Sequence, residues 1–191
     1  MIYLTADLHL FHRLPALARP FNDYQMDELL ISNWNSRIQK GDEVWFLGDF
    51  ALGHAFPDLK KAFDRLVGCK HLILGNHDHN NKIHRLGWAS VHETHLLKPQ
   101  LPELGEERIL IWLSHYAHRT WPQKAHGSLH AYGHSHGHLP PVFNSTDVGV
   151  DANNYFPVSV PEFVAKVRAQ NLILGPEHNE ETNADEESND T

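Results

Sequence analysis

The sequence predicts an α/β fold, and three observations lead to this class. Short apolar segments alternate with segments of helical periodicity through the first half of the chain. Prolines and glycines divide the second half into short strand-like segments. The 191 residues are 41% hydrophobic and 21% charged, which is typical of one globular domain. We expect a single domain of residues 1–175, followed by an acidic tail of residues 176–191.

The first half contains three predicted strands and two predicted helices. The strands are residues 1–6, 43–47 and 71–74. A helix of residues 24–39 follows the first strand, and a second helix around residues 59–66 ends at Gly68. Strands that alternate with helices in this way are typical of a largely parallel sheet covered on both faces.

The second half is richer in predicted strands. They are residues 88–92, 108–113, 129–132 and 146–150. A last helix is expected at residues 160–169, with Pro161 in its first turn. We detect no internal repeat and expect no second core.

Polar residues of the metal-ligand type follow five of the predicted strands. In chain order they are Asp7 with His9, then Asp49, then Asn76 with His77 and Asp78, then His115, and finally His134 with His136. Sites in open α/β sheets form at the carboxyl ends of the strands. We therefore expect these side chains to converge at one edge of the fold.

The residue types favour a pair of transition-metal ions. Imidazole and carboxylate donors together suit Zn, Fe or Mn better than Ca or Mg alone. Seven candidate ligands exceed what one ion accepts while keeping an open position, whereas two ions that share a bridging carboxylate use them all. Such a pair can generate a hydroxide near neutral pH and clamp an in-line displacement. His77 is the candidate proton donor, and Asp78 beside it could orient the imidazole.

These motifs, taken in order, resemble the signature of the calcineurin-like metallophosphoesterases. The segments that carry the resemblance are Asp7-Leu8-His9, Gly48-Asp49, Gly75-Asn76-His77-Asp78, His115 and Gly133-His134-Ser135-His136. The short single-domain form looks like the bacterial and phage-type phosphoesterases of that superfamily. The resemblance implies a four-layer α/β/β/α sandwich of two mixed sheets.

The resemblance also implies a role for each motif residue. Asp7, His9 and His136 would bind one metal, Asn76, His115 and His134 would bind the other, and Asp49 would bridge them. His77 would protonate the leaving oxygen, with Asp78 fixing its orientation. Mn²⁺ is the metal most expected, and Fe, Zn, Ni or Co also occur in the family. The chain departs from many members at Leu52, where a second Asp is usual, which puts the phosphate contacts of that Asp in doubt.

The expected activity is hydrolysis of phosphate monoesters or diesters by a metal-activated hydroxide, with a small phosphoester or a nucleotide as substrate. Phe11, His12 and Arg13 follow the first ligands and are candidate substrate contacts, as are His118 and Arg119 after His115; Arg19 and His79 are weaker ones. The alternative is a catalytically inert interaction module of the same fold. A metallo-β-lactamase-type site lacks its motif here, and an amidohydrolase barrel needs about 250 residues.

Charge and composition bound the partners and the location. The net charge is −8, but residues 176–191 hold seven acidic and no basic side chains, so the remainder is almost neutral. We therefore expect no strong binding to long nucleic acid and a disordered tail. The N-terminus lacks the features of a signal peptide, no apolar run approaches the roughly 18 residues of a membrane span, and Cys69 is the only cysteine. We expect a cytoplasmic protein.

Overall fold

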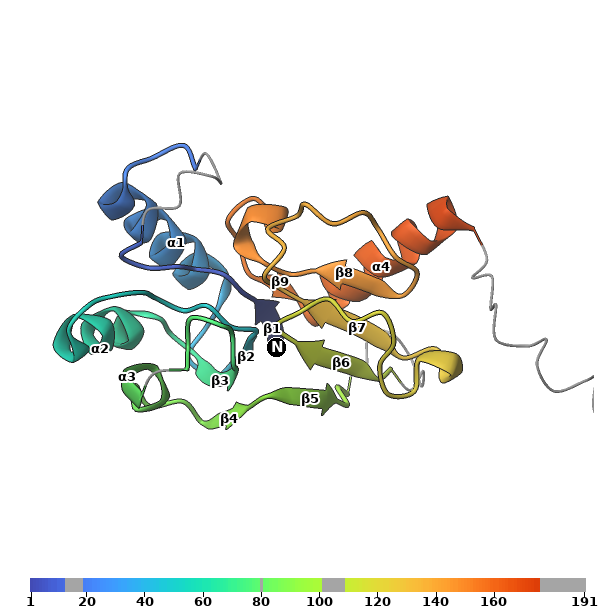
Figure 1. Ribbon diagram of the computed structural model, residues 1–191, viewed down its shortest axis with the longest axis horizontal. Coiled ribbons are helices and arrows are strands. Elements are labelled where there is room, and N and C mark those ends of the chain that lie inside the picture. Colours follow the sequence, from blue (N-terminus) through green and yellow to red (C-terminus); the bar gives the residue numbers. More distant parts are fainter. Residues whose placement is uncertain (13–18, 80, 101–108, 176–191) are drawn as a thin grey trace, which may run out of the picture.

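The computed structural model describes residues 1–12, 19–79, 81–100 and 109–175. Within these ranges the chain forms two mixed β-sheets and four α-helices, so the predicted α/β class is confirmed (Figure 1). The predicted acidic tail, the candidate substrate contact Arg13 and the first residue of the strand predicted at 108–113 lie outside the described residues. No helix in the described ranges is long and apolar enough to cross a membrane.

The first sheet has the strand order β4-β3-β2-β1-β9. Its strands are β1 (Ile2–Thr5), β2 (Glu43–Phe46), β3 (Cys69–Ile73), β4 (Ser90–His92) and β9 (Val158–Ser159). The first four are parallel, with Tyr3 opposite Val44 and Trp45 opposite His71, and β9 runs antiparallel to β1. The parallel β1–β2–β3 arrangement that the alternation of elements predicts is confirmed.

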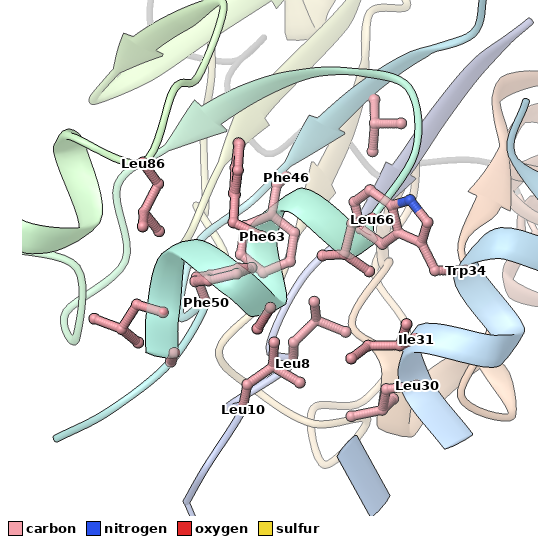
Figure 2. Packing of buried hydrophobic residues seen from close by; sticks show 14 of the residues in the cluster. Leu8, Leu10, Leu30, Ile31, Trp34, Phe46, Phe50, Phe63, Leu66 and Leu86 are labelled. Carbon is pink, nitrogen blue, oxygen red and sulfur yellow. The ribbon is translucent and has the colours of Figure 1, made fainter. Parts of the chain in front are cut away.

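Helices α1 (Asp23–Arg37) and α2 (Phe56–Arg65) pack on one side of the first sheet, and the short α3 (Asn81–His84) follows β3. The Asn22 side chain caps α1 by accepting a hydrogen bond from the Gln25 amide at 3.0 Å. Figure 2 shows the apolar cluster that joins these helices to the sheet. Its labelled residues are Leu8, Leu10, Leu30, Ile31, Trp34, Phe46, Phe50, Phe63, Leu66 and Leu86.

The second sheet has the order β5-β6-β7-β8. Its strands are β5 (Thr94–Leu97), β6 (Ile111–Ser114), β7 (Leu129–Tyr132) and β8 (Ser145–Asp147). β5 is antiparallel to β6, whereas β6, β7 and β8 are parallel. A second apolar cluster combines Trp45 and Leu47 of the first sheet with Leu113 and Ala131 of the second, so the two sheets share this core.

The second cluster corrects the expectation of one core. Side chains alternate between the two faces of a strand, so Val44 and Phe46 enter the cluster under the helices while Trp45 and Leu47 enter the cluster between the sheets. Helix α4 (Val160–Leu174) contributes Phe163 to this second cluster and continues five residues beyond the predicted end. No helix-breaking residue occurs before Gly175, which explains the extra length.

Three further details differ from the prediction. The strand predicted at 146–150 ends at Asp147, and a 3₁₀ helix, η4 (Val150–Asn153), begins where the strand was expected to end. Strand β5 was not predicted, because its first two residues, Thr94 and His95, are polar and only two apolar residues follow them. Strand β9 was not predicted because its two residues are too few to show a period.

Candidate metal centre

The predicted ligands all follow strands whose carboxyl ends meet. Asp7 and His9 follow β1, Asp49 follows β2 and Asn76 follows β3 in the first sheet, while His115 follows β6 and His134 and His136 follow β7 in the second. Backbone hydrogen bonds link the loops directly. The Asp7 amide donates to the Gly48 carbonyl at 2.9 Å, and the Gly133 amide donates to the His115 carbonyl at 2.9 Å. The His134 amide donates to Asp7 Oδ2 at 2.9 Å, so the ligand loops of the two sheets also meet each other.

The first group of donors consists of Asp7, His9 and His136. One ligand atom from each lies within 4.8 Å of the others. Asp7 and His9 are buried, with exposed fractions of 0% and 3%. These are the three residues that the sequence predicts for one metal.

The second group of donors consists of Asp49, His115 and His134, whose ligand atoms also lie within 4.8 Å of one another. The Asn76 Oδ1 atom lies 2.9 Å from His115 Nε2, which adds Asn76 to the same group. This is the set predicted for the other metal, together with the predicted bridging carboxylate.

Asp49 stands between the two groups. Its Oδ2 atom is 3.6 Å from His9 Nε2 and 3.5 Å from His115 Nε2, so one carboxylate oxygen faces a ligand of each group. The same oxygen is 3.9 Å from His77 Nε2, and His9, Asp49 and His77 form a third combination that could hold an ion. A bridging position for Asp49 agrees with these distances.

The ligand loops contain an unusual concentration of left-handed backbone. Five of the predicted ligands have positive φ angles although none is a glycine: Asp7 (61°), His9 (48°), Asp49 (62°), His134 (64°) and His136 (49°). This conformation costs a non-glycine residue roughly 1–3 kcal/mol and persists only where the surroundings enforce it. Such clustering is typical of a functional site.

Glycines leave the space that the ligands occupy. A Cβ atom on Gly48 would lie 2.5 Å from His115 Nδ1, and one on Gly149 would lie 2.6 Å from Asp7 Oδ2. A Cβ on Gly133 would lie 2.8 Å from the same Asp7 oxygen, and one on Gly75 would overlap the Asp49 carboxylate. The backbone therefore approaches the two buried carboxylates as closely as it can.

The electrostatics of the centre fit a cation. Burial, followed by the nearby Asp147 and Asp49 carboxylates, raises the pKa of Asp7 well above its usual value. Burial, followed by His136 and Arg19, lowers the pKa of His9 to about 2, so its imidazole is neutral. Both ring nitrogens of His9 are buried without a hydrogen-bond partner among the described residues. Crowded carboxylates and an orphaned imidazole are costly alone, and a bound divalent ion would compensate both.

Two of the imidazoles are held by their Nδ1 atoms. His115 Nδ1 lies 2.7 Å from the Leu47 carbonyl oxygen, and His136 Nδ1 lies 2.7 Å from Asp151 Oδ2. A carbonyl or carboxylate oxygen only accepts, so the proton is on Nδ1 and Nε2 is free to bind a metal. Burial raises the pKa of Asp151, but the hydrogen bonds from His136 and Arg19 outweigh it and lower this pKa to about 2.

The structure corrects the role expected of Asp78. Its buried carboxylate accepts hydrogen bonds from the backbone amides of Asp49 at 2.7 Å, Phe50 at 3.0 Å and Gly75 at 3.0 Å. These bonds hold the loops after β2 and β3 together, and within the described residues no hydrogen bond joins the Asp78 carboxylate to the His77 imidazole. His77 is fixed instead through its own amide, which donates to Asp49 Oδ1 at 2.9 Å, and its side chain remains 34% exposed beside the donor groups.

The candidate substrate contacts have different positions. His12 stays close to the centre, with its ring centroid 6.4 Å from that of His9. Arg19 does not face a substrate, because its side chain is buried and bonded to Asp151. His118 accepts a hydrogen bond from the Trp112 indole at 3.2 Å, and His79 and Arg119 are exposed.

Two carboxylates beside the centre were not predicted. Asp147 accepts hydrogen bonds from the amides of Gly137 and Gly149 at 2.9 and 2.7 Å, and Asp151 holds His136. Both lie in or after β8, so they show the signal that identified the ligands, an acidic residue at the end of a strand. For Asp147 the signal was concealed because the strand was predicted to run to residue 150, whereas Asp151 directly follows that predicted end and was overlooked.

A cavity of about 390 Å³ lies between α1 and α2, and none of the predicted metal ligands lines it. Leu10 and Phe11, which follow the ligand His9 in the chain, form part of its lining. The Phe11 ring stacks on His54 with a centroid distance of 4.4 Å, and the Phe11 amide donates to the Asp27 carboxylate at 3.1 Å. The lining is mixed: Asp27, Glu28, Asp58, Lys61 and Arg65 are charged, and the other lining residues are apolar or aromatic.

Comparison with known proteins gives relatives whose names state no activity. No profile of a known protein family matches the chain. It is 27% identical over 159 residues to the gene 66 protein of Mycobacterium phage D29, covering 72% of this chain and 79% of that protein. It is 26% identical over 183 residues to an uncharacterized protein of Methanocaldococcus jannaschii, covering 90% of this chain and 94% of that protein.

A solved structure shares the fold. The crystal structure of a protein of unknown function from Aquifex aeolicus matches 87% of this chain and 98% of that one, with a TM-score of 0.65 and 20% identity. Among the relatives found by sequence, the gene 66 protein of Mycobacterium phage L5 is 30% identical to this chain over 159 residues. The match covers 70% of this chain and 76% of that protein. The chain therefore belongs to the same family as the phage L5 gene 66 protein.

Proposed function

We propose that the protein is a dinuclear-metal phosphoester hydrolase of the calcineurin-like metallophosphoesterase superfamily. One observation supports this above all: seven donor side chains from five strand ends form two groups, and Asp49 Oδ2 lies 3.5 to 3.6 Å from an imidazole of each. The four-layer α/β/β/α sandwich is part of the same proposal. The two sheets with α1 and α2 outside the first one are compatible with it.

The donors suit two transition-metal ions. One ion would be held by Asp7, His9 and His136. The other would be held by Asn76, His115 and His134, and Asp49 would bind both ions. Imidazole donors suit Zn, Fe or Ni, and carboxylate and amide oxygens suit Mn. We propose Mn²⁺ first, with Fe, Zn, Ni or Co as alternatives, because the resemblance to the metallophosphoesterases implies it. When bound, the ions would lower the pKa of a water molecule and neutralise charge that develops on the phosphate.

His77 is the proposed general acid. Its imidazole is partly exposed at the open side of the centre, 3.9 Å from Asp49 Oδ2, where the leaving oxygen of a bound ester can reach it. General acids of this type contribute roughly 10²–10⁴-fold to the rate. The deeper imidazoles of His9 and His115 are almost fully buried and suit metal binding instead.

The proposed substrate is a small phosphomonoester, a phosphodiester or a nucleotide. The cavity of about 390 Å³ beside the His9 loop could receive the organic part of such a molecule, and His12 could contact the phosphate. The nearly neutral charge outside the last 16 residues does not favour long nucleic acids. A cytoplasmic location is also proposed, on the single cysteine.

The test is hydrolysis of p-nitrophenyl phosphate and bis(p-nitrophenyl) phosphate with Mn²⁺. We expect turnover that chelator abolishes. Asp49→Asn should lose both metal binding and activity, whereas His77→Asn should keep two bound ions and lose roughly 10²-fold or more in kcat. Turnover by Asp49→Asn in the presence of chelator would refute the proposed function. Loss of metal by His77→Asn would make His77 a ligand rather than the acid.

A further inference from the structure

The Arg19 guanidinium joins two parts of the centre that are distant in the chain. Nε and Nη2 donate to the two carboxylate oxygens of Asp151 at 2.8 and 2.7 Å. Nη1 donates to the Leu8 carbonyl at 2.9 Å, and Nη2 also donates to the Asp7 carbonyl at 2.8 Å. The Arg19 and Asp151 side chains are both more than nine-tenths buried, with exposed fractions of 8% and 9%. A buried bidentate pair of this kind is rigid and specific in direction.

Asp151 extends this contact to a ligand. Its Oδ2 atom accepts both the Arg19 Nη2 proton and the His136 Nδ1 proton, each at 2.7 Å. Asp151 lies in η4, and the amide of Val150 beside it donates to the Ala6 carbonyl at 3.1 Å. The position of the His136 ring is therefore set relative to the end of β1, which carries Asp7 and His9.

We propose that Arg19 and Asp151 are positioning residues that set the metal affinity of the first donor group, which consists of Asp7, His9 and His136. This inference rests on the proposed function. Arg19 holds the backbone at Asp7 and Leu8, while Asp151 fixes the direction and the tautomer of His136, so that its Nε2 atom faces the other two donors. The second donor group depends less on this pair, because its His115 is held by the Leu47 carbonyl, although the His134 amide connects it to the first group by donating to Asp7 Oδ2 at 2.9 Å.

The chemistry of the pair explains why both residues are needed. A carboxylate that accepts the Nδ1 proton of a ligating histidine makes Nε2 a better donor, and loss of such a partner typically costs about 10–100-fold in metal affinity. Only the planar fork of arginine can bind both Asp151 oxygens and two backbone carbonyls together. A lysine keeps the charge but has a single nitrogen with three donors, so it cannot span these acceptors.

A purely structural role for the pair would have different consequences. It would lower the stability of the whole domain without a preference for one donor group. The tautomer of His136 separates the two roles, because it can be read from the ¹⁵N shifts of the imidazole in the metal-free protein. We expect a protonated Nδ1 in the wild type and a substantial Nε2-protonated fraction in Asp151→Ala.

The metal test uses Asp151→Asn and Arg19→Lys, each isosteric or charge-conserving. Mn²⁺ binding is measured by calorimetry and by electron paramagnetic resonance of the free ion, without any substrate. We expect two ions in the wild type and, in both variants, a loss of roughly 10–100-fold at one position with the other within about threefold. Matched controls are Asp64→Asn and Arg37→Lys, which alter exposed ion pairs outside the centre and should leave both affinities unchanged.

The outcomes distinguish this inference from the proposed function. Two unchanged affinities in the variants, or an equal loss at both positions, would overturn the positioning role and leave the hydrolase proposal intact. A wild type that binds no Mn²⁺ would overturn both. Circular dichroism of each variant verifies folding. If Asp151→Asn does not fold, the two Mn²⁺ affinities of Arg19→Lys decide between the outcomes.

Discussion

At the scale of single residues, the centre depends on glycines, which have no side chain, as well as on the ligands. Gly75 and Gly133 bring the backbone against the Asp49 and Asp7 carboxylates, where a Cβ atom has no room. The motif Gly-Asn-His-Asp could therefore be identified from the sequence, but the reason for its glycine is visible only when β2 and β3 lie side by side. The same holds for Asp78, whose three amide partners belong to two different loops.

Gly75→Ala tests the steric requirement. Gly75 has no positive φ angle, so the added methyl group acts only through its overlap with Asp49. We expect a loss of Mn²⁺ binding and a decrease of about 1–3 kcal/mol in the free energy of unfolding, measured by urea denaturation.

Gly41→Ala is the matched control, because a Cβ there meets nothing within 4 Å. It should change the free energy of unfolding by no more than about 0.5 kcal/mol. Equal behaviour of the two variants would contradict a close approach at Gly75.

At the scale of elements, a buried histidine joins three strands of the second sheet. His130 in β7 has Nε2 2.8 Å from Ser114 Oγ of β6 and Nδ1 2.9 Å from Ser145 Oγ of β8. The Ser114 hydroxyl donates to the Tyr116 carbonyl, so it accepts from Nε2, and Nδ1 accepts from Ser145. Each ring nitrogen of the neutral imidazole therefore has a hydrogen-bond partner. His130 therefore has a structural role in the second sheet.

This arrangement predicts a dependence of stability on pH. Burial, followed by the nearby His118, lowers the pKa of His130 from 6.5 to about 3 in the folded protein. Between these values the unfolded chain binds the proton and the folded chain does not, so stability is lost as the pH falls from 6.5 towards 3. One such group contributes a slope of up to about 1.4 kcal/mol per pH unit.

The measurement compares urea unfolding of the wild type and His130→Asn at several pH values between 7 and 4. Other buried histidines, such as His9, also contribute to the total slope, but they are common to both proteins. We expect a shallower slope in the variant whatever its absolute stability. If the free energies of unfolding of the two proteins changed with pH by the same amount, His130 would take up no proton on unfolding.

At the scale of the whole molecule, the two sheets meet where the ligands are. The first donor group takes Asp7 and His9 from the first sheet and His136 from the second, and the second group takes Asp49 from the first and His115 and His134 from the second. Bound ions would therefore connect the sheets directly. An ion that binds only the folded state stabilises it by mass action.

Metal removal should consequently lower the melting temperature. At an ion concentration of about 100 times Kd, each ion adds roughly 2.7 kcal/mol, which corresponds to several degrees in a domain of this size. Differential scanning calorimetry with Mn²⁺ and with excess chelator measures the shift. Asp49→Asn should melt at the same temperature in both conditions, and a wild type without a shift would argue against ions between the sheets.

The sequence by itself determined the strand–helix order of the first half and the seven ligand candidates. Both depend on local patterns, namely apolar periodicity and the residue type after each strand. Only the tertiary structure decided that Asp78 binds backbone amides and that Arg19 and Asp151, 132 residues apart, hold the first donor group together. The physical reason is that the direction of a polar side chain depends on its partners. Those partners are brought within hydrogen-bond distance only when the two sheets pack against each other.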